Sequence, residues 1–268
     1  MKKKSSILLI FAILVGSLFS FSACGQSIPA KEELSRLVAD AILSDNSDAY
    51  RGGECCAEGH KILGSQFSGD RLKVYALTMF GNYGFRNDMF VKVSGSGVIP
   101  AVLTFDPNGE NFVLAEIEYP KDGAYYTKSI KRMFPPRYRM QALKYSEKEA
   151  DELSAQERSY AEVYLKSVGR VAEIGSFRDL NRVLLTDKGI SVEVSNRMSE
   201  DKRLGQYPFW IGTSETVENG VRYVRSLSLD GNAGQIIFQT VEKKNGNVSE
   251  RFVFDSVSGE EIKTETAN

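Results

Sequence analysis

Cysteine and histidine are scarce in this sequence of 268 residues, which contains three cysteines and one histidine. Cys55 and Cys56 are adjacent, and neighbouring Cα atoms lie only about 3.8 Å apart, closer than an ordinary disulfide allows. We therefore expect no disulfide between them, and the fold must be stabilised by its hydrophobic core.

A surplus of basic residues is also missing. Lys and Arg number 34 against 35 Asp and Glu, for a formal net charge of −1. No stretch combines clustered Lys or Arg with interleaved aromatic residues, as a nucleic-acid interface would. We therefore expect no nucleic-acid partner. With 42% hydrophobic residues, the chain can form a substantial core, in one large domain or two small ones.

No apolar run is long enough to span a membrane comfortably, but a shorter run lies at the N-terminus. Three lysines at positions 2–4 precede a 15-residue run from Ile7 to Phe21, in which only Gly16, Ser17 and Ser20 are not strongly apolar. A spanning helix needs about 20 apolar residues. A charged start, an apolar run of this length and small residues at its end predict a signal peptide over residues 1–23.

Ser22 and Ala23 lead directly into Cys24. This resembles the lipobox of bacterial lipoproteins, in which the thiol becomes a diacylglycerol thioether and the cysteine becomes the new N-terminus, although Phe21 replaces the usual Leu or Val. The resemblance implies a lipid anchor on Cys24, with residues 24–28 as a tether, because two acyl chains hold a protein stably on a bilayer. Removing the three leader lysines changes the formal charge from −1 to −4. We expect the mature chain on the outer face of the cell membrane.

The remaining pattern predicts an α+β fold, because helical and strand-like segments occur in separate blocks. Apolar residues at three- and four-residue spacing predict a helix over residues 29–46. Strand-like runs separated by turn signals predict an antiparallel meander over residues 57–119. Both faces of the run 72–80 are rather apolar, so other elements must cover this sheet.

Further helices are expected after the meander. Asp122 as an N-cap predicts a helix over residues 125–134, ended by two prolines. The capping-box spacing of Ser146 and Glu149 predicts a long helix that ends near Gly169.

The last third of the chain is expected to be mostly strands. A short helix is expected over residues 176–185, and hairpin turns over 190–262 predict a second antiparallel sheet. We accordingly divide the chain into an α+β domain at 29–188 and a β-rich subdomain at 189–268, packed on the first.

Cys56, Glu58 and His60 share one face of a predicted strand, because alternate side chains of a strand point the same way. All three are metal-ligand types, but zinc sites take ligands from at least two segments and no second cluster accompanies these residues. The favoured interpretation is a strand with two thiols in or near the core. No metal or other cofactor is expected.

Two residue patterns are compatible with a hydrolytic enzyme. Ser199 and Lys202 form a Ser-x-x-Lys tetrad, which in penicillin-recognising enzymes contains the nucleophile, but its partner motifs are missing. Glu116 and Glu118 share one strand face, whereas a glycosidase pair flanks its sugar from two sides. We therefore expect no catalytic residue and no enzyme activity. The alternative is a cryptic cell-wall hydrolase or acyl-enzyme that uses carboxylates or Ser199.

Two aromatic pairs are the candidates for binding. They are Tyr125 with Tyr126, near a predicted helix start, and Phe209 with Trp210, after a proline. Such rings supply large contact areas with a polar tip. Packing in the core is the alternative for all four side chains, and it is the favoured interpretation.

Several short stretches from Glu58 onward carry a family resemblance: Glu-Gly-His-Lys-Ile-Leu-Gly at 58–64, Val-Ser-Gly-Ser-Gly at 93–97, Pro-Lys-Asp-Gly at 120–123 and Met-Phe-Pro at 133–135. They resemble the extracytoplasmic region attached to beta-lactam-sensor-type membrane metallopeptidases of clostridia-like bacteria. The peptidase of such proteins binds zinc through His-Glu-x-x-His, which a chain with one histidine lacks. The resemblance implies an extracytoplasmic location and a sensing or partner-binding role without proteolysis.

These observations favour a membrane-anchored binding or sensor-accessory module. Its expected partners are the membrane, through the lipid on Cys24, and a membrane protein or an envelope ligand. A structural or self-protection role at the envelope is a further alternative.

Overall fold

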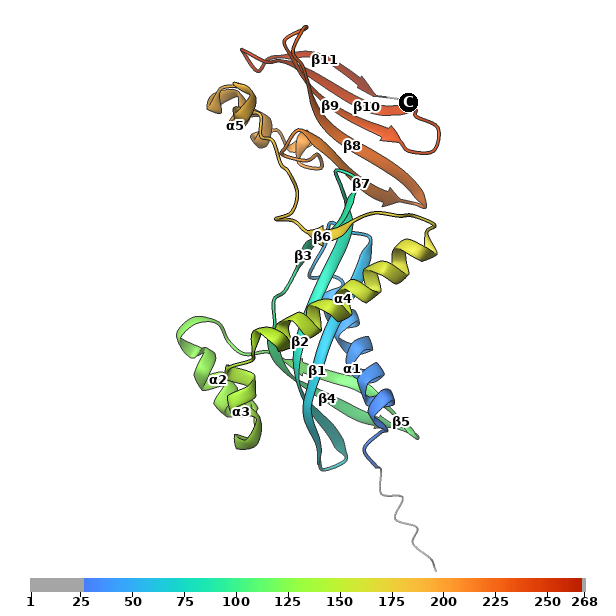
Figure 1. The fold of residues 1–268 in the computed structure, drawn as a ribbon, viewed down its shortest axis with the longest axis vertical. Coiled ribbons are helices and arrows are strands. Elements are labelled where there is room, and N and C mark those ends of the chain that lie inside the picture. The colour runs from blue at the N-terminus through green and yellow to red at the C-terminus, as the bar shows by residue number, and fades with distance from the viewer. Residues whose placement is uncertain (1–26, 267–268) are drawn as a thin grey trace, which may run out of the picture.

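The computed structural model describes residues 27–266, so the predicted signal peptide and Cys24 lie outside the described residues. The fold is α+β, as predicted, with five α-helices and eleven strands in the described range. The molecule is elongated, with α1 and β4–β5 toward one end and β8–β11 at the other (Figure 1).

The first helix, α1 (Lys31–Asn46), confirms the predicted amphipathic helix. Its first turn carries Glu32 and Glu33, where negative charge favours the helix dipole. Leu34, Val38 and Ile42 recur on one face and are buried.

The long strand β2 (Arg71–Arg86) is the centre of the sheet. β1 (Cys55–Ser68) pairs with it antiparallel along one side. β4 (Ile99–Asn108) and β3 (Met89–Gly95) share its other side, one after the other. The predicted simple meander is therefore wrong, because β3 and β4 are both short enough to pair with the same long strand and do not pair with each other.

Two further strands extend this part of the sheet. β5 (Asn111–Glu118) pairs antiparallel with β4, and the short β6 (Ile174–Ser176) pairs parallel with β3. The turns between β1 and β2, β2 and β3, and β4 and β5 lie at the turn signals of the sequence.

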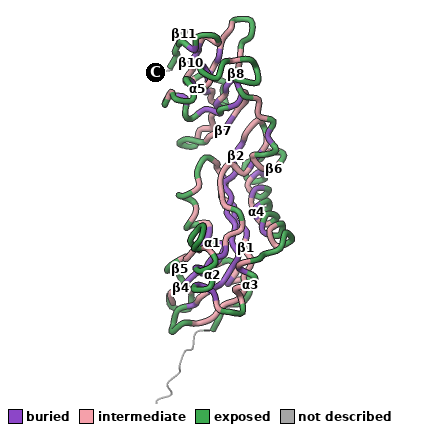
Figure 2. The backbone as a smooth tube through the Cα atoms, turned by 90° about the vertical axis from the view of Figure 1, so that its left-hand side faces the viewer, coloured by how far each residue is buried: buried purple, intermediate pink, exposed green. Residues whose placement is uncertain are grey.

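Helices cover both faces of β2, which confirms the expectation from its apolar faces. On one face, Val74 and Ala76 pack in a core cluster with α1. On the opposite face, Tyr75 packs against α2 (Tyr126–Met133) and α3 (Pro136–Leu143), which follow a 3₁₀ turn, Gly123–Tyr125. Figure 2 shows the buried positions running along these strands.

The long helix α4 (Glu147–Ser167) has the predicted capping box of Ser146 and Glu149, and Gly169 beyond its end is left-handed at φ +64°. It crosses the sheet diagonally (Figure 1). Gly59 of β1 permits the contact, because a Cβ there would lie 2.2 Å from the carbonyl oxygen of Leu153. α4 therefore covers part of β1. Among the described residues, β1 pairs only with β2, so its other edge has no strand partner.

The C-terminal part is a five-stranded antiparallel array with α5 (Val192–Glu200) on one face. Met198 of α5 packs in one core cluster with Leu227, Phe238 and Phe252. The strands, in order along the sheet, are β7 (Gly212–Glu218), β8 (Val221–Asp230), β9 (Gln235–Glu242), β10 (Val248–Asp255) and β11 (Glu261–Thr266).

Two sequence predictions fail near this part. Residues 176–185 form no helix; they make turns and an isolated bridge from Val183 to Ile211, because the segment packs against the start of the C-terminal sheet. The segment from 190 begins with α5, capped by Ser191, whereas strands were predicted. The second sheet is also continuous with the first, since Arg86 of β2 pairs with Ser214 of β7.

Asn87, at the tip of the β2–β3 hairpin, reinforces this connection. Its backbone is left-handed at φ +46°, as a tight hairpin turn requires. Its side-chain oxygen accepts hydrogen bonds from the backbone of Thr213 at 2.8 Å and from the indole nitrogen of Trp210 at 3.3 Å.

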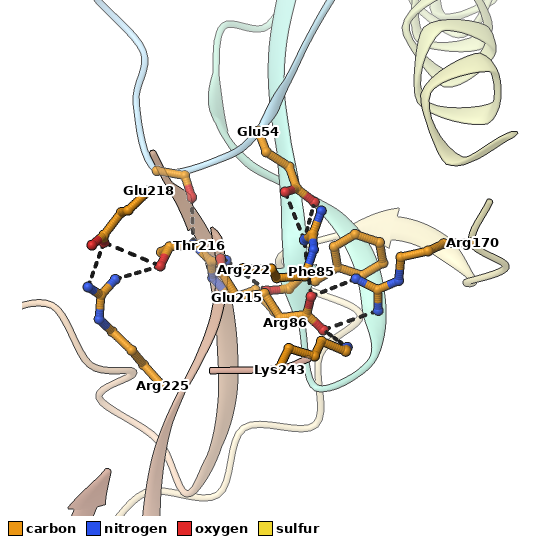
Figure 3. Close-up of polar contacts among 11 residues, drawn as sticks. Glu54, Phe85, Arg86, Arg170, Glu215, Thr216, Glu218, Arg222, Arg225 and Lys243 are labelled. Carbon is orange, nitrogen blue, oxygen red and sulfur yellow. Dashed lines mark hydrogen bonds and ion pairs between the residues drawn. The ribbon is translucent and has the colours of Figure 1, made fainter. Parts of the chain in front are cut away.

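Charged side chains complete the junction (Figure 3). The buried Glu215 carboxylate accepts two bonds from Arg170, at 2.6 and 3.1 Å, and is also paired with Arg222 and Lys243. The Arg170 guanidinium lies 3.4 Å from the ring centroid of Phe85. A single carboxylate on β7 is thus held by cations from the α4–β6 connection, β8 and the loop after β9.

No helix within residues 27–266 is long and apolar enough to cross a membrane.

Candidate functional site

The single histidine lies in a hydrogen-bonded chain with a serine and a glutamate. Ser35 Oγ is 2.7 Å from His60 Nε2, and His60 Nδ1 is 2.8 Å from Glu58 Oε2. The side chains of His60 and Glu58 are only 8% and 3% exposed. We name Ser35, His60 and Glu58 the serine–histidine–glutamate chain.

Strand geometry explains why Glu58 and His60 lie together, but not the contact with Ser35. Glu58 and His60 are two residues apart on β1, so they share a face, as the sequence predicts. Ser35 comes from α1, which packs on the same face of the sheet. The hydrogen bond between Ser35 and His60 therefore depends on the position of a helix 25 residues away in the sequence.

Two side chains of α4 support the histidine and the glutamate. Gln156 Oε1 accepts from the His60 backbone nitrogen at 3.0 Å, and Gln156 Nε2 donates to the His60 carbonyl at 3.1 Å. The Tyr160 hydroxyl donates to Glu58 Oε1 at 3.1 Å. Burial, followed by the nearby Glu58 carboxylate, raises the pKa of Tyr160 to about 12. Tyr160 is thus a neutral donor at physiological pH.

The serine–histidine–glutamate chain forms the wall of an open hollow of about 410 Å³ between α1 and α4. The other lining side chains include Arg36, Asp40 and Ser159. Arg36 and Asp40 are exposed. The hollow is therefore polar and open to solvent.

A second cavity lies in the C-terminal part, between α5 and the strands β8 and β9. Its volume is about 200 Å³. We name it the α5 cavity; it is lined mainly by apolar side chains, with two serine hydroxyls, from Leu185, Ser195, Met198, Ser199, Leu204, Tyr207, Pro208, Phe209, Leu227 and Phe238. Phe209, a predicted binding residue, is 61% exposed at this cavity.

The other predicted binding residues lie elsewhere. Trp210 is only 3% exposed, donates to Asn87, and packs edge-on against Phe177 with ring centroids 5.5 Å apart. It is a core residue in this fold. Tyr126, the first residue of α2, is half-buried against the core, whereas Tyr125 is 64% exposed.

Tyr125 lines a separate hollow of about 350 Å³ with three cations, Lys121, Lys128 and Arg132. This hollow and the α5 cavity share no lining residue. The two aromatic pairs are therefore not brought together in one site.

Ser199 also lines the α5 cavity, but its surroundings differ from those of an acyl-enzyme. Its hydroxyl donates to the carbonyl of Asn196 at 2.8 Å, a bond within the last turn of α5. Lys202 is exposed in the following 3₁₀ turn, Lys202–Leu204. Glu118, one of the two predicted surface carboxylates, forms an ion pair with Arg132.

A buried pair that the sequence analysis did not identify joins β3 to α4. Lys92 Nζ donates to both carboxylate oxygens of Glu157, at 2.9 and 3.0 Å, and Tyr83 donates to the same carboxylate at 3.3 Å. Burial raises the pKa of Glu157 above its ordinary value, although Lys92 acts in the opposite direction. This pair fastens α4 to the sheet.

The two cysteines within the described range are free thiols. Cys55 is buried, and burial raises its pKa to about 12, so it is a neutral thiol. Cys56 is half-buried beside Asn82. Over residues 27–266, no group of three or more His, Cys, Asp and Glu side chains is arranged to hold a metal ion.

The chain matches no protein-family model, no curated protein and no solved structure. The resemblance to the extracytoplasmic region of sensor-type metallopeptidases remains a prediction.

Proposed function

We propose that this protein is a lipid-anchored extracytoplasmic binding module. In this proposal, lipid on Cys24 holds the chain at the outer face of the cell membrane, and the folded part recognises an envelope component or a membrane partner. The sequence features that support the anchor are the basic start, the short apolar run and the small residues that directly precede Cys24.

The observation that carries the binding role is the α5 cavity with Phe209 at its mouth. Phe209 is 61% exposed, although burial of a phenylalanine ring is strongly favourable. Its ring lies edge-on to Trp210, with centroids 5.0 Å apart. Phe177 and Arg182 also contact this ring, with its centroid 6.4 Å from the Phe177 ring and 6.0 Å from the Arg182 guanidinium, yet more than half of Phe209 stays exposed.

The chemistry of the lining defines the occupant. Apolar side chains such as Leu227 and Phe238 form the wall, and Ser195 and Ser199 add hydroxyls on α5. Binding sites that are mainly apolar with a few convergent polar groups fit an apolar group that carries one or two hydrogen-bonding atoms. A volume of about 200 Å³ fits a single aromatic or branched aliphatic group. We propose that such a group of the partner is inserted here.

The arrangement of the elements fits an anchored binder. The start of α1 lies toward one end of the elongated molecule, whereas α5 and β8–β11 lie at the other (Figure 1). An anchor that precedes α1 would therefore present the α5 cavity on the far side from the lipid.

Site-specific photo-crosslinking in cells tests this proposal. A photoreactive phenylalanine analogue would replace Phe209 in the full-length chain, and a control chain would carry the same analogue at Val163, which is 66% exposed on α4. The proposal predicts one dominant cross-linked species, identified by mass spectrometry, that is specific to position 209. Identical products from both positions would contradict it.

A further inference from the structure

We propose that the serine–histidine–glutamate chain is a nucleophilic site that hydrolyses short acyl esters of polar alcohols. Ser35 is the nucleophile, His60 is the general base and acid, and Glu58 is the positioning residue for His60. This activity is separate from binding in the α5 cavity, and neither proposal depends on the other.

The order of the hydrogen bonds is the first argument. A nucleophile must lie within about 2.6–3.2 Å of its base, and the base must lie equally close to the acid that orients it. Here Ser35 Oγ is 2.7 Å from His60 Nε2, and His60 Nδ1 is 2.8 Å from Glu58 Oε2. A Glu58 carboxylate that accepts from Nδ1–H leaves the Nε2 lone pair to accept the Ser35 hydroxyl proton. This is the tautomer that a serine nucleophile requires.

The rigidity of the base is the second argument. The backbone of His60 is held on both polar atoms by Gln156, and Glu58 is held by Tyr160. The imidazole is 8% exposed, so it has little freedom to turn away from Ser35. Preorganised bases of this kind require no rearrangement during the reaction.

Access to the serine is the third argument. Ser35 is half-buried and lines the open hollow, so a substrate can reach its oxygen. Arg36 is the one lysine or arginine among the residues that line the same hollow. Its guanidinium is the group that can stabilise the negative charge that develops on the substrate carbonyl oxygen.

The lining also defines the substrate class. Asp40, Ser159 and Gln156 make the hollow polar, and Ala39 is the one aliphatic side chain of its lining. An acetyl group on a hydroxylated or charged compound fits such a lining, which offers no cluster of aliphatic side chains for a long acyl chain.

The reaction is balanced with water as the second reactant. Ser35 Oγ attacks the ester carbonyl carbon while His60 Nε2 takes the hydroxyl proton. The bond to the alcohol oxygen then breaks, and the imidazolium gives its proton to that oxygen. Water next attacks the acyl-serine, giving one proton to His60. The acid leaves, and the proton on His60 returns to Ser35.

The test uses the full-length chain, purified in detergent, with a fluorophosphonate probe and 4-nitrophenyl acetate. The probe forms an oxygen–phosphorus bond with a reactive serine and releases fluoride. The proposal predicts that the label is on the peptide that contains Ser35, and that Ser35→Ala and His60→Gln each lower labelling and acetate turnover at least 100-fold. Acetate should be preferred over octanoate esters at least tenfold.

Ser167→Ala is the control, because Ser167 is exposed at the end of α4, is not among the residues that line the hollow, and donates to the Tyr164 carbonyl. It should retain wild-type labelling. Glu58→Gln should lower kcat at least tenfold with KM within twofold, as expected of a residue that orients the base. Each variant is compared after its melting temperature shows that it is folded.

Absence of label on Ser35 in the folded wild-type protein would overturn the proposal. Equal labelling of the wild type and the folded Ser35→Ala or His60→Gln variant would overturn it as well. In either case the serine–histidine–glutamate chain only joins α1 to the sheet.

Discussion

Glu215 is the single residue that best explains how the first part of the sheet and the C-terminal strands are held together. Its carboxylate is 4% exposed and is paired with Arg170, Arg222 and Lys243. Burial alone would raise the pKa of Glu215, but the hydrogen bonds from Arg170 and Lys243 outweigh it, so the pKa lies below its ordinary value. The ionised carboxylate is therefore favoured by the folded state.

Replacing Glu215 should weaken this junction. Glu215→Gln should lower the free energy of unfolding at neutral pH by about 3 kcal/mol, because Arg170 and Lys243 lose their buried carboxylate and Arg222 keeps only that of Glu54. The matched control is Glu162→Gln, which removes a half-exposed pair with Arg158 and should cost at most about 0.5 kcal/mol. Chemical denaturation measures both values.

The lowered pKa also predicts a dependence on pH. The stabilisation from Glu215 is fully present above its ordinary pKa of 4.5, and it is lost as the pH falls through the lower native value. The difference in unfolding free energy between the wild type and Glu215→Gln should therefore shrink below pH 4.5. A difference that stays constant down to pH 2 would contradict the assignment.

At the scale of elements, α4 is the helix that organises the first part of the sheet. It provides Gln156 and Tyr160 for the serine–histidine–glutamate chain, and its Glu157 pairs with Lys92. Close approach at Gly59 makes these contacts possible.

An added methyl group at Gly59 should therefore displace α4. Gly59→Ala should lower the free energy of unfolding by about 1–3 kcal/mol, in the range of overpacked sites. Gly97→Ala is the control, because a Cβ at Gly97 meets no atom within 4 Å. Thermal unfolding of the two variants checks the prediction, and equal melting temperatures would refute it.

The sequence predicts elements whose signals are local and misses those that depend on packing. The capping box of Ser146 and Glu149 lies within one turn, so α4 is predicted well. Residues 176–185 have a helical pattern but pack as an irregular connection, because Val183 forms a bridge with Ile211.

The same distinction applies to the candidate sites. The shared face of Glu58 and His60 follows from strand alternation, whereas the contact with Ser35 requires the packing of α1 on β1. The predicted pair of Phe209 and Trp210 divides into one exposed and one buried ring, and only the buried Trp210 bonds to Asn87 of the β2–β3 hairpin. Neighbouring residues in a sequence can therefore have different roles.

At the scale of the whole molecule, the proposed anchor and the α5 cavity define two opposite ends. The lipid would be attached before α1, and the sheet continues through β2 and β7 to the cavity. The Arg86–Ser214 pairing, Asn87 and Glu215 make this path continuous.

A lipid anchor on Cys24 predicts that the chain leaves the membrane when this cysteine is replaced. Cys24→Ser removes the thiol that would carry the lipid, so the chain should be released from the membrane fraction into the soluble fraction. Ultracentrifugation and intact-mass measurement check this. Cys56→Ser is the control, because Cys56 lies within β1 and its removal should leave the protein on the membrane. Acylated, membrane-bound Cys24→Ser protein would contradict the anchor.

The proposed binding role requires that a partner group occupies the α5 cavity. The yield of the cross-link from position 209 should therefore fall when Ser195→Phe fills the cavity that Ser195 lines. At least a tenfold loss of the position-209 product is expected in a chain that is still folded and still on the membrane. An unchanged yield in that chain would contradict it.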